Sequence, residues 1–463
     1  MNGSRQMNGS RKMTGTRRMN GTRKMTGTRR MNGTYLRFVG GQAVSVLGDQ
    51  VWYVALSWSA VRLASPSAAG AVMAVSALPR LAFLLLGGAL VDRSDSRRLM
   101  IGSDLLRCAV ALTAAVLAGR QESVALLVAV ALVFGAADAV FLPAASTVPP
   151  RLLPPERLSQ GAAVAALAAR LALTLGAPLG GVLVAAGGLP IACVVNAGTF
   201  VVSVLALRGL PPGRAAAPSR EPATTTSRDA VPSREPVVAA LRAGLRYLGR
   251  RRLLRTILVV SLLTNLGFVG PMNVGLALVS DDRGWGSAGI GVLLAGFGGG
   301  AVAASLAMLR MRWRGGVGIA AAAGIVAQAV GVFAVAVADS VPAAVAATIV
   351  VGLTSGVVGV LLSALLQART DDAFRGRVGS IGSFLNLGIT PIAMAVMGVA
   401  TDRLGTVPAF AASAALELIA AAFCLAVTEL RTARLPAEEP KEAAKEAGKE
   451  EANEAGKDAA GRG

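Results

Sequence analysis

Long apolar stretches recur along most of this chain, and they leave it few folds to adopt. From residue 36 onward we count about twelve, each close to the roughly 20 residues that a helix needs to cross about 30 Å of hydrocarbon. The sequence therefore predicts an all-α polytopic membrane protein with twelve transmembrane helices. The predicted spans are 36–63, 68–91, 99–118, 124–147, 158–186, 189–207, 255–279, 287–309, 317–338, 342–367, 378–401 and 406–428.

Composition supports this class and excludes several others. Hydrophobic residues make up 54% of the chain and charged residues only 16%, which is too apolar for a soluble globular protein. The net charge of +20 comes from arginines in tails and loops with few aromatic residues among them, so we expect no nucleic-acid partner. The sequence has no histidine, and its three cysteines lack metal-ligand spacing. We therefore expect no metal, no cofactor and no enzyme, with any proton chemistry carried by Asp or Glu.

Charge and composition divide the chain into five parts. An N-terminal arm repeats a basic hexapeptide, and is either a coding-repeat expansion or an arm on anionic lipid. Two six-helix halves flank a linker whose second part is amphipathic, either a structural strut or a helix on the membrane surface. A charged tail ends the chain. The parts are the arm 1–35, the halves 36–207 and 255–428, the linker 208–254 with its amphipathic helix 237–250, and the tail 429–463.

Basic residues are concentrated in alternate loops. The loops on one side hold roughly twenty and those on the other about four, and basic residues in short loops mark the cytoplasmic side. With an even number of spans, we expect both termini in the cytoplasm.

A compact motif lies between the second and third spans. A glycine is followed four residues later by an acid and an arginine and then by two more arginines; these residues are Gly88, Asp92, Arg93, Arg97 and Arg98. The pattern resembles the loop 2–3 signature of the major facilitator superfamily, and it is most similar to the drug-efflux branch with macrolide and siderophore (enterobactin-type) exporters. The resemblance implies two parallel six-helix repeats around a central site, in a bacterial plasma membrane.

Ionisable residues inside predicted spans are costly and are therefore functional candidates by default. The resemblance places spans 1 and 4 at the central cavity, which puts Asp49 and Asp138 nearest the substrate. These acids either exchange partners with Arg80 and Arg170 as protons bind and leave, or form fixed ion pairs that brace the bundle. Glu417, in the last span, has no role that the sequence explains.

Two further groups of residues are candidates. Asp104 and Arg107 form an i,i+3 pair, which either joins the loop motif in an inner charge network or is a surface pair. The fifth span resembles the Gly-Pro-x-x-Gly-Gly motif of proton-coupled drug antiporters, with proline one place late. A proline kink and small residues there allow helices to pack closely. This packing is either the motif's only role or part of the antiport mechanism. The motif residues are Gly176, Pro178, Gly180 and Gly181.

The reading that fits these features is a secondary active transporter. No phosphate-binding Gly-x-x-x-x-Gly-Lys-Ser/Thr stretch occurs, so energy should come from an ion gradient. We expect proton-coupled antiport that exports small amphipathic compounds such as an antibiotic, drug or siderophore, by a monomer in contact with the lipid bilayer. The alternatives are an importer or facilitator of a small polar nutrient with the same fold, a membrane-embedded enzyme, and a transporter-like membrane sensor.

Overall fold

The computed structural model describes residues 32–91, 95–211, 237–310, 313 and 315–435. Most of the N-terminal arm and the charged tail, the first part of the linker, and Asp92 and Arg93 of the loop motif lie outside the described residues. Every regular element within the described part is helical.

The N-terminal half contains six spans in five long helices. The helix α6 holds two of the spans, because Gly187 and Gly188 interrupt its helical backbone. Gly188 has a φ of +67°, a left-handed conformation that glycine adopts without steric cost. The predicted boundary between the spans 158–186 and 189–207 falls at this point. The elements are α1 (Gly33–Leu63), α2 (Pro66–Val91), α3 (Ser96–Ala118), α4 (Val124–Ser146), α5 (Pro149–Leu152), η1 (Pro155–Arg157) and α6 (Leu158–Arg208).

The C-terminal half begins with the helix α7 (Val237–Arg250) and contains six more spans. Its first span is continuous from α8 through one π-helical turn, η2, into α9. The remaining elements are α8 (Arg252–Gly270), η2 (Pro271–Gly275), α9 (Leu276–Asp282), α10 (Gly286–Arg310), α11 (Val317–Val337), α12 (Val341–Ala368), α13 (Asp372–Leu404), α14 (Thr406–Ala426) and α15 (Thr428–Arg431).

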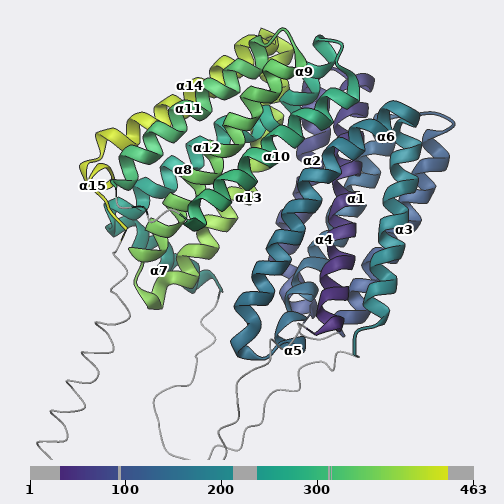
Figure 1. The fold of residues 1–463 in the computed structure, drawn as a ribbon, viewed down its shortest axis with the longest axis horizontal. Coiled ribbons are helices and arrows are strands. Elements are labelled where there is room, and N and C mark those ends of the chain that lie inside the picture. Colours follow the sequence, from purple (N-terminus) through teal and green to yellow (C-terminus); the bar gives the residue numbers. More distant parts are fainter. Residues whose placement is uncertain (1–31, 92–94, 212–236, 311–312, 314, 436–463) are drawn as a thin grey trace, which may run out of the picture.

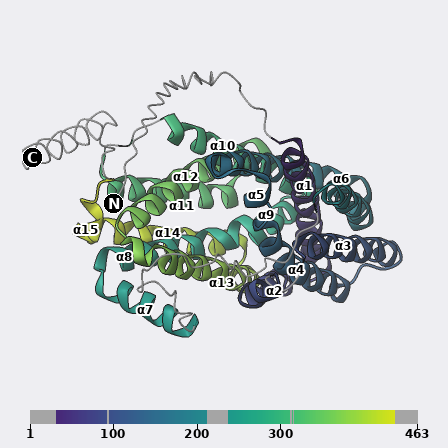
Figure 2. The same cartoon turned by 90° about the horizontal axis from the view of Figure 1, so that it is seen from below.

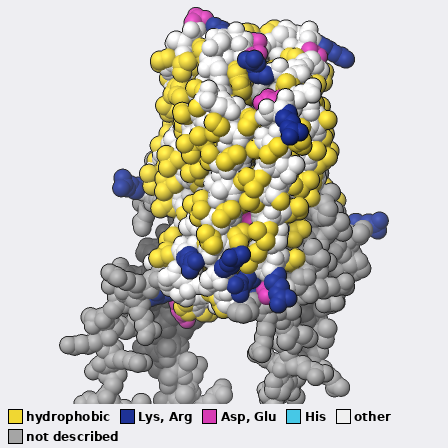
Figure 3. All heavy atoms as spheres, turned by 90° about the vertical axis from the view of Figure 1, so that its right-hand side faces the viewer, with side chains coloured by type: hydrophobic (Ala, Val, Ile, Leu, Met, Phe, Trp, Pro, Cys, Tyr) yellow, Lys and Arg dark blue, Asp and Glu magenta, His cyan; other side chains and the backbone are white. Residues whose placement is uncertain are grey.

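The number of spans agrees with the prediction. Nine helical segments of the described residues are long and apolar enough to cross a membrane, and one of them, 155–208, contains two spans. With α1 and α2, of 31 and 26 residues, the total is twelve. Hydrophobic side chains cover the middle of the face in Figure 3, and charged side chains gather mainly toward its two ends, as expected for a surface that contacts lipid.

The two halves form separate bundles that meet along two helix pairs (Figures 1 and 2). Within the N-terminal half, α6 packs against α1 and α3, and α4 packs against α2 and α3. Within the C-terminal half, α12 packs against α10 and α11, and α14 packs against α8 and α11. Between the halves, α2 contacts α13 and α6 contacts α10.

Glycines allow close contact at both of these pairs. A Cβ on Gly398 of α13 would lie 2.5 Å from the carbonyl oxygen of Pro66 and 2.8 Å from the Cα of Gly70. A Cβ on Gly291 of α10 would lie 2.8 Å from the carbonyl oxygen of Ala177 in α6. These positions are near the helix ends far from α5 and α7, so the halves are held together most closely at that end (Figure 1).

We predict that Gly398→Val weakens the contact between α2 and α13. The added side chain would displace backbone, at a cost of about 1–3 kcal/mol, typical of overpacked sites. A cysteine introduced near the start of α2 should then react faster with a membrane-impermeant thiol reagent. Gly379→Val in the same helix is the control, because its Cβ would meet nothing within 4 Å. Equal labelling of both variants would contradict the contact.

Candidate functional site

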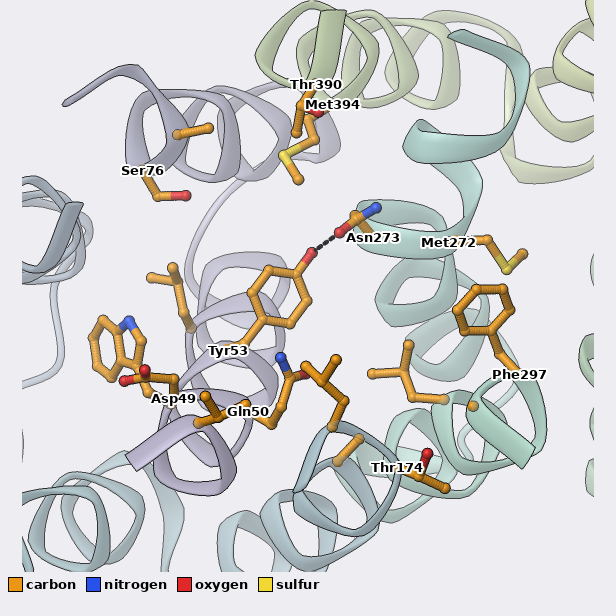
Figure 4. A pocket seen from close by; sticks show the side chains of 18 of the residues that line it. Asp49, Gln50, Tyr53, Ser76, Thr174, Met272, Asn273, Phe297, Thr390 and Met394 are labelled. Carbon is orange, nitrogen blue, oxygen red and sulfur yellow. Dashed lines mark hydrogen bonds between the residues drawn. The ribbon is translucent and has the colours of Figure 1, made fainter. Parts of the chain in front are cut away.

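A cavity of about 740 Å³ lies between the two halves (Figure 4). Helices α1, α2, α4 and α6 form one wall, and α8, η2, α10 and α13 form the other. This volume is within the range of pockets that hold drug-sized ligands.

The two walls differ in chemistry. The charged lining residues all come from the N-terminal half, whose wall also includes the aromatic residues Trp52 and Phe134, whereas the wall from the C-terminal half is uncharged and mostly apolar. A ligand that fits both walls must therefore have a polar and an apolar face. The first wall includes Asp49, Gln50, Tyr53, Asp138, Arg170 and Thr174; the second includes Phe268, Met272, Asn273, Leu294, Phe297, Thr390 and Met394.

Arg107 lies behind the acidic part of this cavity, at the middle of α3. Its side chain is only 2% exposed and faces three carboxylates. The Nη2 atom is 2.5 Å from Oδ1 of Asp104, which is itself fully buried. The Nη1 atom is 2.6 Å from Oδ1 of Asp138 and 3.8 Å from Oδ2 of Asp49. One guanidinium nitrogen is thus held by Asp104, and the other faces both acids that line the cavity.

Two aromatic rings pack against the same guanidinium. Its Cζ is 4.9 Å from the ring centroid of Phe141 and 4.5 Å from that of Phe200. Both distances allow cation–π attraction, which is strongest where water is excluded. Arg107 therefore replaces its hydration with carboxylates and aromatic faces, which is how a charge is accommodated inside a membrane.

The arrangement corrects the expected partners of the charged residues. Asp104 and Arg107 are not a surface pair, because both are buried beside the cavity acids. Asp92 and Arg93, with which they were expected to form an inner charge network, lie outside the described residues. Arg107 pairs with Asp49 and Asp138, whereas the expected Arg170 has an exposed side chain that lines the cavity. Arg80 lies in α2, but its side chain is outside the described residues.

A hydrogen bond crosses the cavity from one half to the other. The Tyr53 hydroxyl of α1 donates to Oδ1 of Asn273 in the π-helical turn η2 (Figure 4). The Nδ2 atom of Asn273 donates in turn to the Val269 carbonyl at 2.7 Å, which fixes the orientation of the amide. Neither residue was singled out from the sequence, although an asparagine inside an apolar span was a signal.

The glycine motif of the fifth span lies where helices approach closely. Cβ atoms on Gly176 and Gly180 would lie 2.8 Å from the Leu47 carbonyl oxygen and 2.9 Å from the Cα of Val51, both in α1. A Cβ on Gly181 would lie 2.7 Å from the carbonyl of Ser287 in the other half. The motif thus packs α6 against α1 and α10, and Pro178 lies at the α10 contact.

Arg97 of the loop motif joins the start of α3 to the end of α6. Arg97 donates to the carbonyls of Leu207 and Arg208 at the end of α6, at 3.2 and 2.7 Å. Such bonds satisfy carbonyls that a helix end leaves unpaired. Gly88 lies within α2, and the exposed Arg98 is 3.9 Å from Asp95.

Comparisons with known proteins agree with this geometry. The family model described as Major Facilitator Superfamily matches residues 38–384, most of the chain. The chain belongs to the Major Facilitator Superfamily. It is a multi-pass membrane transporter for small molecules, not an enzyme.

Several relatives of this superfamily member are named as efflux proteins. The "Multidrug efflux pump Tap" of Mycobacterium tuberculosis is 26% identical over 410 residues, which cover 85% of this chain and 91% of the relative. The protein of the same name in Mycolicibacterium fortuitum is 26% identical over 372 residues, 77% of this chain and 87% of the relative.

Solved structures of superfamily members share the fold. The nucleoside transporter NupG has a TM-score of 0.63 and 14% identity, with 85% of this chain and 99% of that chain covered. A bacterial homologue of the human lysosomal transporter Spinster, in an inward-facing and unoccupied conformation, has a TM-score of 0.60 and 12% identity, with 86% of this chain and 97% of that chain covered.

We predict that Arg107→Gln destabilises the transporter by about 3–5 kcal/mol, because Asp104 is left as a buried charge without its cation. The measurement is the free energy of unfolding in detergent. The double variant Arg107→Gln/Asp104→Asn should lose less free energy of unfolding than Arg107→Gln alone. Arg170→Gln is the control, because Arg170 also lines the cavity but its side chain is exposed. This variant should change the free energy of unfolding by less than about 1 kcal/mol. A loss no larger for Arg107→Gln than for this control would contradict the structural role of Arg107.

Proposed function

We propose that this transporter exports small amphipathic compounds, such as an antibiotic, drug or siderophore, from a bacterial cell in exchange for protons. The observation that carries the proposal is the cavity, which combines carboxylates on one wall with aromatic groups on both walls and thioether groups on the other. The relatives named multidrug efflux pumps support the same direction of transport.

The proposed orientation puts the end with α5 and α7 in the cytoplasm. Arginines are concentrated in the loops and helix ends on that side, and cytoplasmic loops of membrane proteins carry such an excess. The close glycine contacts then seal the outer side, and compounds enter the cavity from the cytoplasm or the inner leaflet.

Proton coupling is proposed to depend on the sharing of Arg107. Its Nη1 atom faces both Asp49 and Asp138, while Asp104 holds Nη2. When one cavity acid binds a proton or faces a cationic substrate, the other is the better partner for the guanidinium. Loss of the proton reverses the preference, because an ionised carboxylate competes for the same donor. Substrate and proton therefore compete for one site.

The hydrogen bond between Tyr53 and Asn273 is proposed to favour the conformation seen here. It joins the two halves within the cavity, whereas alternating access requires the halves to rock about this region. Transport must break the bond in each cycle, and its modest strength permits this.

We predict that Asp49→Asn and Asp138→Asn each abolish proton-driven efflux. Asparagine keeps the shape of the side chain but cannot exchange a proton, and the remaining acid keeps Arg107 permanently. Cells that express the protein should export a lipophilic cationic dye in a protonophore-sensitive manner, and the variants should not, at equal membrane abundance. Asp339→Asn is the control, since this acid is 94% exposed and pairs with Arg283. Unchanged efflux in both cavity variants would refute proton coupling here.

We also predict that Tyr53→Phe reduces the population of the present conformation roughly 2- to 10-fold, the effect of one hydrogen bond. Spin labels on the two halves would report it as a change in distance distribution. Tyr247→Phe is the matched control: its hydroxyl accepts a bond from the Asp371 amide within the C-terminal half. An identical distribution for Tyr53→Phe and wild type would show that the bond does not bias the equilibrium.

A further inference from the structure

Glu417 and Gln328 face each other inside the C-terminal half, away from the cavity. Glu417 lies at the middle of α14 and Gln328 at the middle of α11, and these two helices pack together. Their exposed fractions are 0% and 1%. Nε2 of Gln328 donates to Oε1 of Glu417 at 3.3 Å. The pair therefore lies at membrane depth with little access to water.

Each residue has one oxygen that lacks a hydrogen-bond partner in the described part of the chain. These are Oε2 of Glu417 and Oε1 of Gln328, and both are buried. An ionised carboxylate can only accept hydrogen bonds, so it leaves the amide oxygen unpaired. A protonated acid has an O–H group, and one proton on Glu417 would pair both orphan oxygens. Exchanging the amide oxygen and nitrogen of Gln328 only changes which carboxyl oxygen needs the proton.

The surroundings of Glu417 offer no compensating charge. On α8, a Cβ on Gly267 would lie 2.8 Å from Cγ of Glu417, so backbone covers this side. Within the described residues, α11 and α14 contain no other charged residue. The charged residues of the other elements packed against α14 are near helix ends: Arg252 and Arg255 of α8; Asp372, Arg375, Arg377, Asp402 and Arg403 of α13; and Glu429 and Arg431 of α15. An ionised Glu417 would thus be an isolated charge at membrane depth, which is costly.

We propose that Glu417 binds a proton in the folded transporter and forms a carboxylic acid–carboxamide pair with Gln328, joined by two hydrogen bonds. This proton site is separate from Asp49 and Asp138 and does not depend on proton-coupled export. It fixes α14 to α11 behind α8, whose Phe268 lines the cavity. The proton is a structural part of the cavity wall and is not exchanged in each transport cycle.

Infrared spectroscopy of the purified protein at neutral pH tests the proposal. The difference spectrum between wild type and Glu417→Gln should contain the carbonyl stretch of a protonated carboxylic acid, shifted in deuterated water. Gln328→Leu should move this band to higher frequency, because the acid carbonyl loses its amide donor. Carboxylate bands in place of the acid band, or an acid band that Gln328→Leu does not move, would overturn the proposal.

The pH dependence of thermal stability is a second readout. In the unfolded chain an exposed glutamate loses its proton above about pH 4.3, whereas the folded protein keeps it. The unfolded state then binds fewer protons, so stability falls as the pH rises. The unfolding temperature of wild type should fall more than that of Glu417→Gln from mildly acidic to alkaline pH. Glu429→Gln, at the exposed end of the half, is the control and should behave as wild type. Parallel curves for wild type and Glu417→Gln would overturn the proposal.

Discussion

The burial of one guanidinium at the middle of α3 determines how charge is arranged in the N-terminal half. Arginine stays protonated in proteins, so Arg107 must find its counter-charges within the bundle. Asp104 supplies one beside it, and Asp49 and Asp138 approach from α1 and α4. The rings of Phe141 and Phe200 cover its faces. Three carboxylates thus face one cation, and two of them, Asp49 and Asp138, also line the cavity.

The C-terminal half meets this charged wall with a different surface. Its contribution is aromatic and aliphatic, and its buried acid lies behind the wall, paired with Gln328. The halves touch most closely where glycines let backbones approach, as at Gly398 and Gly291. Because these contacts lie toward one end, the bundles can separate there only by losing packing that small residues made possible. The charged groups of the cavity thus come from the N-terminal half alone, whereas apolar groups come from both halves.

Much of the fold could be predicted from the sequence, because membrane thickness fixes the length of each apolar stretch. Twelve spans and the break at Gly188 followed from that rule. Asp49 and Asp138 could be named because charges inside spans are conspicuous. Their partner could not, since helix spacing shows which residues share a face but not which neighbour that face meets. Arg107 was expected either to join the loop motif or to form a surface pair, although it lies buried at the middle of α3. Asn273 and Gln328, the partners of Tyr53 and Glu417, were harder still to single out from the sequence, because they are uncharged.

We propose that substrate and proton compete for the acids that share Arg107. The most direct test counts protons released when a lipophilic cation binds to the purified transporter in weakly buffered solution, with a pH-sensitive dye as the readout. Competition for these acids predicts proton release from wild type and none from Asp49→Asn or Asp138→Asn, since in either variant the remaining acid is held by Arg107. Binding without proton release in wild type, or equal release in wild type and both variants, would contradict it.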